Sequence, residues 1–261
     1  DFGLEDGPGG IVSLYSDGVP TVAYALVDAH GHVLRTFDAE RVFYSASTVK
    51  LGVLIAALRE VQSGAWSLED ELRVTHEFAS IVPEAGRLVT DAEETDPGLG
   101  SPGDIVSRAW VLNRMTTVSA NCATNMCFEA LGPEKIAAVS RDAGSPETRM
   151  GRPYSDEAGL AAGITNSASP LGLARLMAAL VRGELLNAEL TAYAMQLLHE
   201  RDDPVISTVA TRLAASRGWP VYTGGKGGSV DGIKHDVAFV QRDGETLILA
   251  VCTRAYSVPQ G

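Results

Sequence analysis

Apolar residues near the two ends of the chain recur at the spacing of β-strands. Two extended runs joined by a turn at Gly31 cover residues 22–40, a pattern that is typical of a β-hairpin. Extended patterns return over 221–230 and 235–255, and Asp243-Gly244 marks a tight turn within the second of them. The sequence therefore predicts strands at both ends of the chain.

Between these strands, over about residues 47–198, apolar residues follow the 3.6-residue period of helices. The first helix is expected to stop at Gly64, and residues 105–131 predict one or two more. Ser169-Pro170 is typical of a helix start, with the serine as cap and the proline at the first helical position. Residues 87–104, rich in acidic residues, glycine and proline, predict a solvated acidic loop.

If the terminal strands join in one sheet, the helical middle becomes a second lobe, and a cleft lies where the lobes meet. We predict a discontinuous sheet lobe of residues 1–46 and 201–261 and an all-α lobe of residues 47–200. The expected fold class is α/β plus all-α, an antiparallel sheet flanked by helices with an all-helical lobe.

Composition narrows the classes of partner. A chain of 261 residues that is 45% hydrophobic can bury a substantial core. No apolar run reaches the roughly 18 to 20 residues that span a bilayer. The net charge of −12 argues against nucleic acid, which needs a basic face. We expect a monomer that acts on a small molecule, without a nucleic-acid partner or a membrane span.

Cysteine and histidine usage predicts no metal and no cofactor. The three cysteines form no CxxC and argue against a disulfide framework or a zinc site, although one disulfide stays open. His30 and His32 flank a turn without a carboxylate or cysteine cluster, as solvated residues do. The sequence starts at Asp1 without a leader, so we expect a mature secreted or cell-envelope protein, with a cytoplasmic location as the alternative.

Candidate chemistry begins at the first predicted helix, where one of only four lysines follows a serine by three residues. Ser47 would lie near the positive end of the helix dipole, and Lys50 would project from the same helix face. Burial disfavours a lysine ammonium, so Lys50 could serve as a base toward an otherwise weak nucleophile. The alternative is a capping serine followed by a lysine that reaches solvent.

Two further polar groups stand out. Ser119-Ala120-Asn121 places a hydroxyl and an amide at a helix–loop junction, where they could shuttle a proton and hold a substrate carbonyl, or simply cap a helix. Residues 223–232 surround Lys226 with glycines, which indicates close approach of a ligand to the backbone. A phosphate-binding loop is excluded because Gly227, not Ser or Thr, follows the lysine, and no helical pattern comes after it.

In their order and separation, Ser47-x-x-Lys50, Ser119-x-Asn121 and Lys226-Gly-Gly228 resemble the S-x-x-K, S-D-N and K-[TS]-G motifs of class A β-lactamases and penicillin-binding D-alanyl-D-alanine peptidases. The resemblance covers nearly the whole chain, including residues 118–132 and 166–186. It implies a β-lactamase/transpeptidase-like fold with an active site in the cleft between the lobes.

The resemblance also implies a role for each matching residue. Ser47 would be the acylated nucleophile, and Lys50 would accept its proton. Ser119 would relay that proton to the leaving group, while Asn121 would contact the substrate amide and the lysine. Lys226 would be the electrostatic anchor beside Ser119.

Backbone groups and small residues complete the expected site. The N–H groups of Ser47 and Ser229 would form the oxyanion hole. Gly227, Gly228 and Thr223 would line the bound substrate. No metal is implied.

The chain departs from the family pattern at several places. Ala120 replaces the carboxylate of S-D-N, and Gly227 replaces the hydroxyl of K-T-G, for which Ser229 or Thr223 could compensate. The Glu-x-x-Leu-Asn signature of the omega loop is missing from residues 149–170, whose only carboxylates are Asp156 and Glu157. Glu157 is thus the one candidate deacylation base, and a weak one. The family's final helix is expected to be missing or cut short.

These features favour an active-serine hydrolase that cleaves an amide or ester through a Ser47 acyl-enzyme and is a poor β-lactamase. One alternative is a transacylase or D,D-peptidase that passes the acyl group to an amine. Another is a degenerate, non-catalytic ligand-binding protein. Substrate identity lies in loops without a readable pattern.

Overall fold

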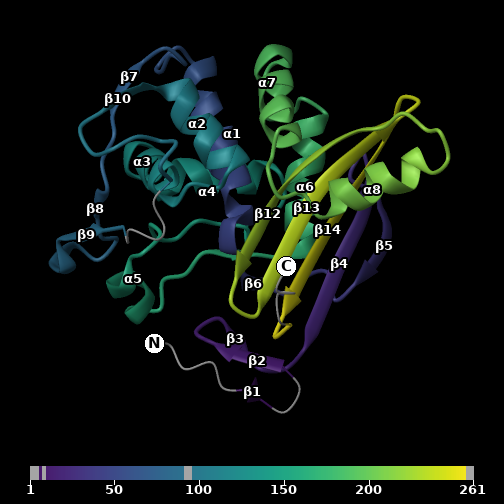
Figure 1. Ribbon diagram of the computed structural model, residues 1–261, viewed down its shortest axis with the longest axis horizontal. Coiled ribbons are helices and arrows are strands. Elements are labelled where there is room, and N and C mark those ends of the chain that lie inside the picture. Colours follow the sequence, from purple (N-terminus) through teal and green to yellow (C-terminus); the bar gives the residue numbers. More distant parts are fainter. Residues whose placement is uncertain (1–5, 8–9, 91–95, 257–261) are drawn as a thin grey trace.

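The computed structural model describes residues 6, 7, 10–90 and 96–256. Its centre is a five-stranded antiparallel sheet in the order β12-β13-β14-β4-β5, which joins both ends of the chain (Figure 1). The sheet strands are β4 (Thr21–Asp28), β5 (Val33–Phe37), β12 (Tyr222–Val230), β13 (Ile233–Arg242) and β14 (Glu245–Arg254). The predicted fold class, an antiparallel sheet flanked by helices with a helical lobe, is confirmed.

The two predicted hairpins are present, and their turns explain the residues found there. Gly31, between β4 and β5, has a φ of +84°. Asp243 and Gly244, between β13 and β14, have φ values of +52° and +81°, as a two-residue hairpin turn requires. Asp243 and Gly244 belong to the residue types that tolerate the left-handed region best.

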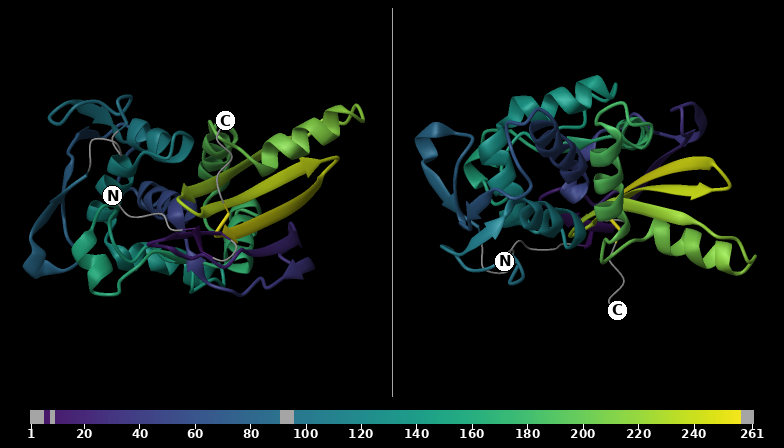
Figure 2. Two further views of the ribbon diagram at one scale, coloured as in Figure 1. Left: turned by 60° about the horizontal axis from the view of Figure 1, so that its bottom comes forward. Right: turned by 90° about the horizontal axis from the view of Figure 1, so that it is seen from above.

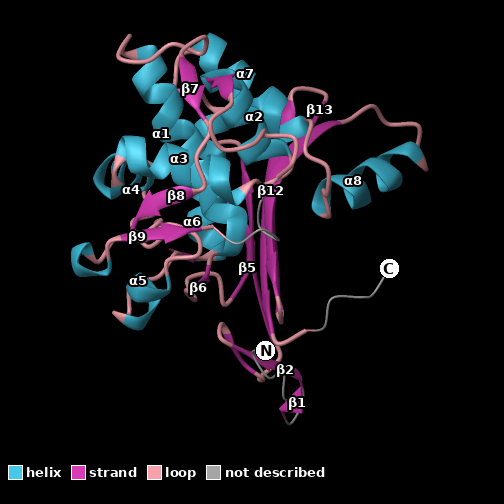
Figure 3. Cartoon of the chain, turned by 60° about the vertical axis from the view of Figure 1, so that its left-hand side comes forward, coloured by secondary structure: helices cyan, strands magenta, loops and turns pink. Residues whose placement is uncertain are grey.

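The helical lobe is built around one buried helix. Helix α1 (Lys50–Gln62) has every residue from Lys50 to Leu58 buried, and it packs against five other helices of the described chain. These are α2 (Arg108–Thr117), α3 (Asn121–Leu131), α4 (Pro133–Asp142), α6 (Pro170–Val181) and α7 (Ala188–His199). Figure 3 shows the lobe beside the sheet. A helix that is apolar all round is expected to lie in a core.

Further helices cover the sheet. Helix α6 (Pro170–Val181) begins as predicted, with the Ser169 hydroxyl accepting a hydrogen bond from Gly172 N, and it packs on β4, β13 and β14. Helix α8 (Ile206–Ala215) contacts β12 and β13 and projects along the sheet (Figure 2). Neighbouring residues of a strand face opposite sides. Because Thr223 bonds to Ser207 of α8 whereas Gly224 abuts α7, these two helices cover opposite faces of β12.

The predicted all-α stretch also contains short strands, and in this the structure differs from the expectation. Strands β7 (Glu71–Arg73) and β10 (Ile105–Ser107) pair, as do β8 (Glu77–Ala79) and β9 (Arg87–Val89). Residues 87–89 of the predicted loop are therefore strand, whereas residues 91–95 lie outside the described ones. Three-residue strands are too short to give a periodic signal.

Smaller elements complete the chain. They are β1 (Asp6–Gly7), β2 (Gly10–Ser13), β3 (Ser16–Asp17), β6 (Phe43–Tyr44), the 3₁₀ helices η1 (Ala46–Val49) and η2 (Pro83–Ala85), α5 (Glu157–Ala161) and β11 (Ser167–Ala168). The expectation of a shortened final helix concerns residues 257–261, which lie outside the described ones. Within the described part of the chain, no helix combines the length and apolarity needed to cross a bilayer.

All three cysteines are buried and none is in a disulfide, so the disulfide left open by the sequence is not formed. His32 Nδ1 lies 2.9 Å from Asp28 Oδ2 at the exposed hairpin turn. Among the described residues, no group of three or more His, Cys, Asp or Glu side chains could hold a metal ion.

Two buried glycines make a matched test of the packing. A Cβ on Gly52 would meet its nearest neighbours at 3.9 Å, so Gly52→Ala should raise the free energy of unfolding by about 0.5–1 kcal/mol. A Cβ on Gly224 would lie 2.7 Å from the His199 N of α7, so Gly224→Ala should lower that free energy by about 1–3 kcal/mol. Urea unfolding followed by circular dichroism measures both; a stable Gly224→Ala protein would contradict the close packing of α7 on β12.

Candidate active site

The predicted nucleophile lies in a short turn that leads directly into the buried helix. Ser47 belongs to η1, a single 3₁₀ turn, and Lys50 is the first residue of α1. The preceding residue, Ala46, has a left-handed φ of +45°. Such backbone geometry is costly for a residue other than glycine and is found most often at functional sites.

The three sequence motifs meet at one hydroxyl group. Lys50 Nζ donates to Asn121 Oδ1 at 2.7 Å, to Ser119 O at 2.5 Å and to Ser119 Oγ at 3.1 Å. Lys226 Nζ, from the sheet, donates to the same Ser119 Oγ at 2.9 Å and to Gly227 O at 3.0 Å. Ser119 also has a left-handed backbone, with a φ of +65°. The structure thus brings together residues separated by more than a hundred positions.

Burial changes the acidity of the sheet lysine. Lys226 is 2% exposed, and its burial, reinforced by the nearby Arg201 guanidinium, lowers its pKa to about 7. The carboxylates of Asp236 and Asp203 act in the opposite direction but do not compensate. Lys226 can therefore lose or gain a proton near neutral pH.

Arg201 explains why glycine replaces the hydroxyl residue of the K-T-G motif. A Cβ at Gly227 would lie only 2.8 Å from the Arg201 Nη2 atom. Arg201 is held there by an ion pair with Asp236, 2.5 Å long, in which both side chains are 5% exposed. Asp236 also accepts hydrogen bonds from the N–H groups of Val205 and Ile206 at the start of α8. The guanidinium occupies space that a threonine would need.

The glycine-rich strand approaches the nucleophile closely. A Cβ on Gly228 would lie 2.5 Å from Ser47 N, so only glycine fits beside the expected oxyanion hole. Ser229 is exposed at the same edge, where its hydroxyl bonds to Ile233 O. Thr223, expected to line the substrate, is instead buried on the other face of β12. There its hydroxyl lies 2.7 Å from Phe239 O and 2.9 Å from Ser207 Oγ. Ser229 is thus better placed than Thr223 to replace the missing hydroxyl.

A tyrosine from the omega-loop stretch contacts the serine–lysine pair. Tyr154 donates its hydroxyl to Ala46 O at 2.8 Å, and its ring centre lies 4.5 Å from Lys50 Nζ. Asn125, one turn after Asn121 on α3, clamps the Tyr154 backbone through two hydrogen bonds of 2.8 and 3.0 Å. A phenol therefore stands beside the lysine.

Asp156 and Glu157, the two carboxylates of the omega-loop stretch, differ in burial. Asp156 is buried and caps α5, accepting hydrogen bonds from Gly159 N, Ile81 N and the Ser80 hydroxyl. Glu157, the candidate deacylation base, is exposed in the first turn of α5 on the wall of a wide cavity. At the other altered motif position, Ala120 is buried within the hydrophobic core, where a carboxylate would be costly.

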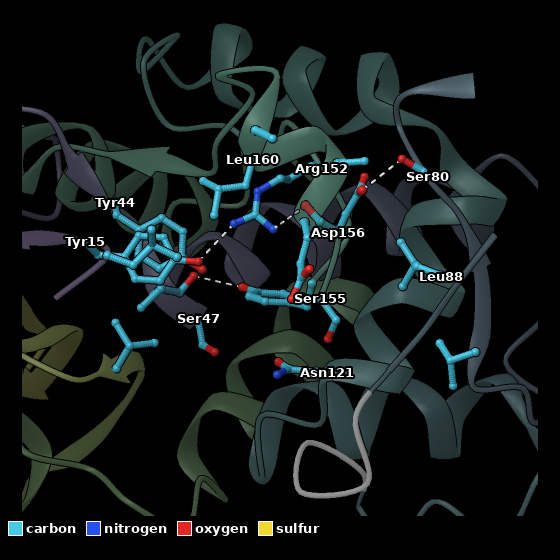
Figure 4. Close-up of a pocket in the computed structure, with 18 of the residues that line it drawn as sticks. Tyr15, Tyr44, Ser47, Ser80, Leu88, Asn121, Arg152, Ser155, Asp156 and Leu160 are labelled. Carbon is cyan, nitrogen blue, oxygen red and sulfur yellow. Dashed lines mark hydrogen bonds between the residues drawn. The ribbon is translucent and has the colours of Figure 1, made fainter. Parts of the chain in front are cut away.

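Ser47 lies where two hollows meet. The larger, of about 1180 Å³, extends over Tyr15, Tyr44 and Arg152 (Figure 4). The smaller, of about 370 Å³, contains Lys226 and Arg201. Ser47, Asn121 and Ser229 line both hollows. When a substrate carbonyl lies at Ser47, the two parts of the substrate on either side of it could therefore occupy the two different hollows.

Sequence reasoning missed Tyr154, Arg201 and His235. His235 bridges Tyr44 O and Thr253 N, and burial lowers its pKa to about 4, so it is a neutral structural residue. The only available signal for Tyr154 was an aromatic residue within a Gly- and Ser-rich loop. No sequence signal indicated Arg201, because its spatial neighbour Gly227 is distant in the sequence.

The fold and the serine–lysine site define a serine hydrolase. The model of the β-lactamase enzyme family matches residues 13–260. The chain therefore belongs to that family.

Solved structures with the same fold include a β-lactamase from Sphaerobacter thermophilus DSM 20745, with 22% identity and a TM-score of 0.71 over 90% of this chain and 82% of that one. PBP-A shares 23% identity with a TM-score of 0.72, over 93% and 84%. A mutant of PBP-A, in an acyl-enzyme complex with penicillin G, shares 22% with a TM-score of 0.71, over 93% and 84%. No curated protein sequence matches the chain.

The pKa of Lys226 predicts how ligand affinity depends on pH. Below about pH 7 the charged Lys226 should attract a ligand carboxylate. Above that pH, Lys226 of the free protein is neutral. Binding of a carboxylate-bearing ligand to the Ser47→Ala protein, measured by calorimetry, should therefore weaken roughly tenfold between about pH 6 and pH 8.

Lys226→Met should bind more weakly and show little pH dependence. Lys234→Met is the matched control, because Lys234 lines the same hollow but is paired with Asp203 at its surface. It should keep the wild-type pH profile. A flat profile in the protein with Lys226 intact would rule out this lysine as the anchor.

Proposed function

We propose that this protein is an active-serine acyl-transfer enzyme that cleaves an amide or ester, β-lactams included, through an acyl-enzyme on Ser47. The observation that carries the proposal is the Ser119 hydroxyl, shared by the two buried lysines next to the nucleophile. A hydroxyl with two ammonium neighbours can accept from one and pass a proton to a leaving group. A serine that only caps a helix would not need a hydrogen bond from either lysine.

The geometry supports a simple sequence of steps. Ser47 Oγ attacks the substrate carbonyl, and its proton passes to Lys50 once that lysine is neutral. The N–H groups of Ser47 and Ser229 stabilise the developing oxyanion. Ser119 then delivers a proton to the leaving group, while Lys226 attracts a carboxylate on that side.

The surroundings of Tyr154 support slow deacylation. Hydrolysis of the ester needs a base that activates water, which typically contributes about 10²–10⁴ in rate. Tyr154, the residue of this loop in contact with Lys50, donates its hydroxyl proton to Ala46 O and so is not arranged as a base. Glu157 is exposed at the cavity wall. A β-lactam acyl-enzyme should therefore persist.

A long-lived acyl-enzyme favours the second candidate, a transacylase or D,D-peptidase in which an amine takes the acyl group. The wide cavity next to Ser47 has room for such an acceptor. The third candidate, a degenerate binding protein, rested on Ala120 and Gly227. It loses support because Arg201 fills the space at Gly227, so that glycine is a packing requirement rather than a sign of decay.

Intact mass after incubation with a fluorescent penicillin and with activated phenyl esters tests the proposal. Wild-type protein should gain one acyl group, and Ser47→Ala should gain none while keeping its circular dichroism spectrum and melting temperature. Ser63→Ala, an exposed serine at the end of α1, is the matched control and should label normally. Labelling that survives in the Ser47→Ala protein would remove Ser47 as the nucleophile.

Replacement of Tyr154 tests the cause of the slow step. Tyr154→Glu places a carboxylate next to Lys50 and should shorten the lifetime of the penicillin acyl-enzyme by about 10²-fold, as general-base help does. Tyr154→Phe removes the hydrogen bond to Ala46 O without adding a base, so its acyl-enzyme should stay long-lived. Rapid hydrolysis by the wild type without a burst, lost in Glu157→Gln, would show that Glu157 supplies the base instead.

A further inference from the structure

A buried arginine faces the wide cavity and has no acidic partner within the part of the chain that the structure describes. Arg152 is 2% exposed, and its Nη2 donates to the Tyr15 hydroxyl at 3.0 Å. Its Nη1 makes two long contacts of 3.3 Å with the carbonyls of Pro153 and Asp156, while its Nε has no hydrogen-bond partner among the residues that the structure describes. No carboxylate of the described residues lies within ion-pair distance of the Arg152 guanidinium.

This state is unusual for a charged group. Buried charges in proteins are normally paired, because an unpaired one loses its hydration without compensation. The neighbouring phenol cannot act as the counter-charge, because burial raises the pKa of Tyr44 and keeps it neutral. The Asp156 carboxylate is occupied by Ser80, Ile81 and Gly159.

The arginine shares its cavity with the nucleophile. Arg152 and Ser47 both line the hollow of about 1180 Å³, and Figure 4 shows the Arg152 guanidinium directed toward Tyr15 and Tyr44. Tyr15 lies in the turn between the paired strands β2 and β3 and stacks on Tyr44, with ring centres 3.8 Å apart. The N-terminal segment therefore helps to form one wall of this hollow.

We propose that Arg152, oriented by Tyr15, is a binding site for a carboxylate on the acyl part of the substrate. A guanidinium matches a carboxylate through paired hydrogen bonds, and Arg152 has donor capacity left. This proposal rests on the proposed function and adds a substrate class, acyl donors that carry a negative charge. It is separate from Lys226 and Arg201, which lie in the smaller hollow.

The other charged groups of the cavity are arranged differently. Arg87 is exposed and pairs with Glu129 at 3.6 Å. Glu157 and Asp231 are exposed on the wall, where solvent screens them. Arg152 is thus the one buried cation among the described residues that line the wide cavity.

Two matched esters test the preference. The phenyl monoester of glutaric acid carries a free carboxylate, and the phenyl ester of glutaramic acid replaces it with an amide of the same shape. In each case the Ser47 oxygen bonds to the acyl carbon, the bond to phenol breaks, and the serine proton leaves with the phenol. Phenol release and intact mass give the acylation rate.

Wild-type protein should react with the carboxylate ester about tenfold faster or more, because charge-assisted hydrogen bonds are the stronger ones. Arg152→Gln should bring the ratio of the two rates close to one, and Tyr15→Phe should reduce it. The ratio comes from one protein sample, so partial misfolding does not alter it. Arg87→Gln, the other arginine of this cavity, is the matched control and should keep the wild-type ratio.

Equal rates in the wild type, or an unchanged ratio in Arg152→Gln, would overturn the anion site while leaving the acyl-transfer function intact. If neither ester acylates Ser47, the proposed function fails, and calorimetry of glutarate against glutaramide, the uncharged diamide, on the same protein decides the anion site alone. Tighter binding of glutarate that Arg152→Gln abolishes would support it. Equal or undetectable binding of the two would overturn it.

Discussion

Two buried lysine ammonium groups that share one serine hydroxyl dominate the arrangement of this protein. Like charges repel, and both lysines are almost fully withdrawn from water, so their placement is costly unless acceptors surround them. The acceptors come from the backbone and side chain of Ser119 and from Asn121. The left-handed Ser119, the start of α3 and the glycine-rich strand all serve to bring these groups together. The lowered pKa of Lys226 reflects the part of the cost that remains.

The departures from the family pattern become understandable once their spatial neighbours are known. Glycine is required at Gly227 because the Arg201 guanidinium fills the volume that a side chain there would need. Ala120 is buried in apolar surroundings, where a carboxylate would be costly. Tyr154 lies beside Lys50, in the loop that carries the water-activating glutamate in class A β-lactamases.

Much of the fold and the centre of the site could be predicted from the sequence, because the signals are local. A serine and a lysine three residues apart face the same way wherever the helix lies. Glycine at Gly31 and Gly244 permits the turns that set the two hairpins. The short strands β7 to β10 could not be predicted, since three residues contain too little periodicity. The packing of Thr223 against Ser207 of α8 could not be predicted either, because only the packed helices show which side of a strand faces the cleft.

The sequence by itself determined the order of the main helices and of the sheet strands, and the three motifs on which the proposed serine–lysine chemistry rests. Tertiary structure decided which charges are neutralised and which are not. Arg201 is paired with Asp236 of β13, whereas Arg152 bonds, among the described residues, only to a phenol and to carbonyl groups. No pattern in the sequence distinguishes these two arginines. Both are buried, and their difference arises from the partners that the fold places beside them, because the energy of a charge depends on what surrounds it in space and not on its neighbours in the sequence.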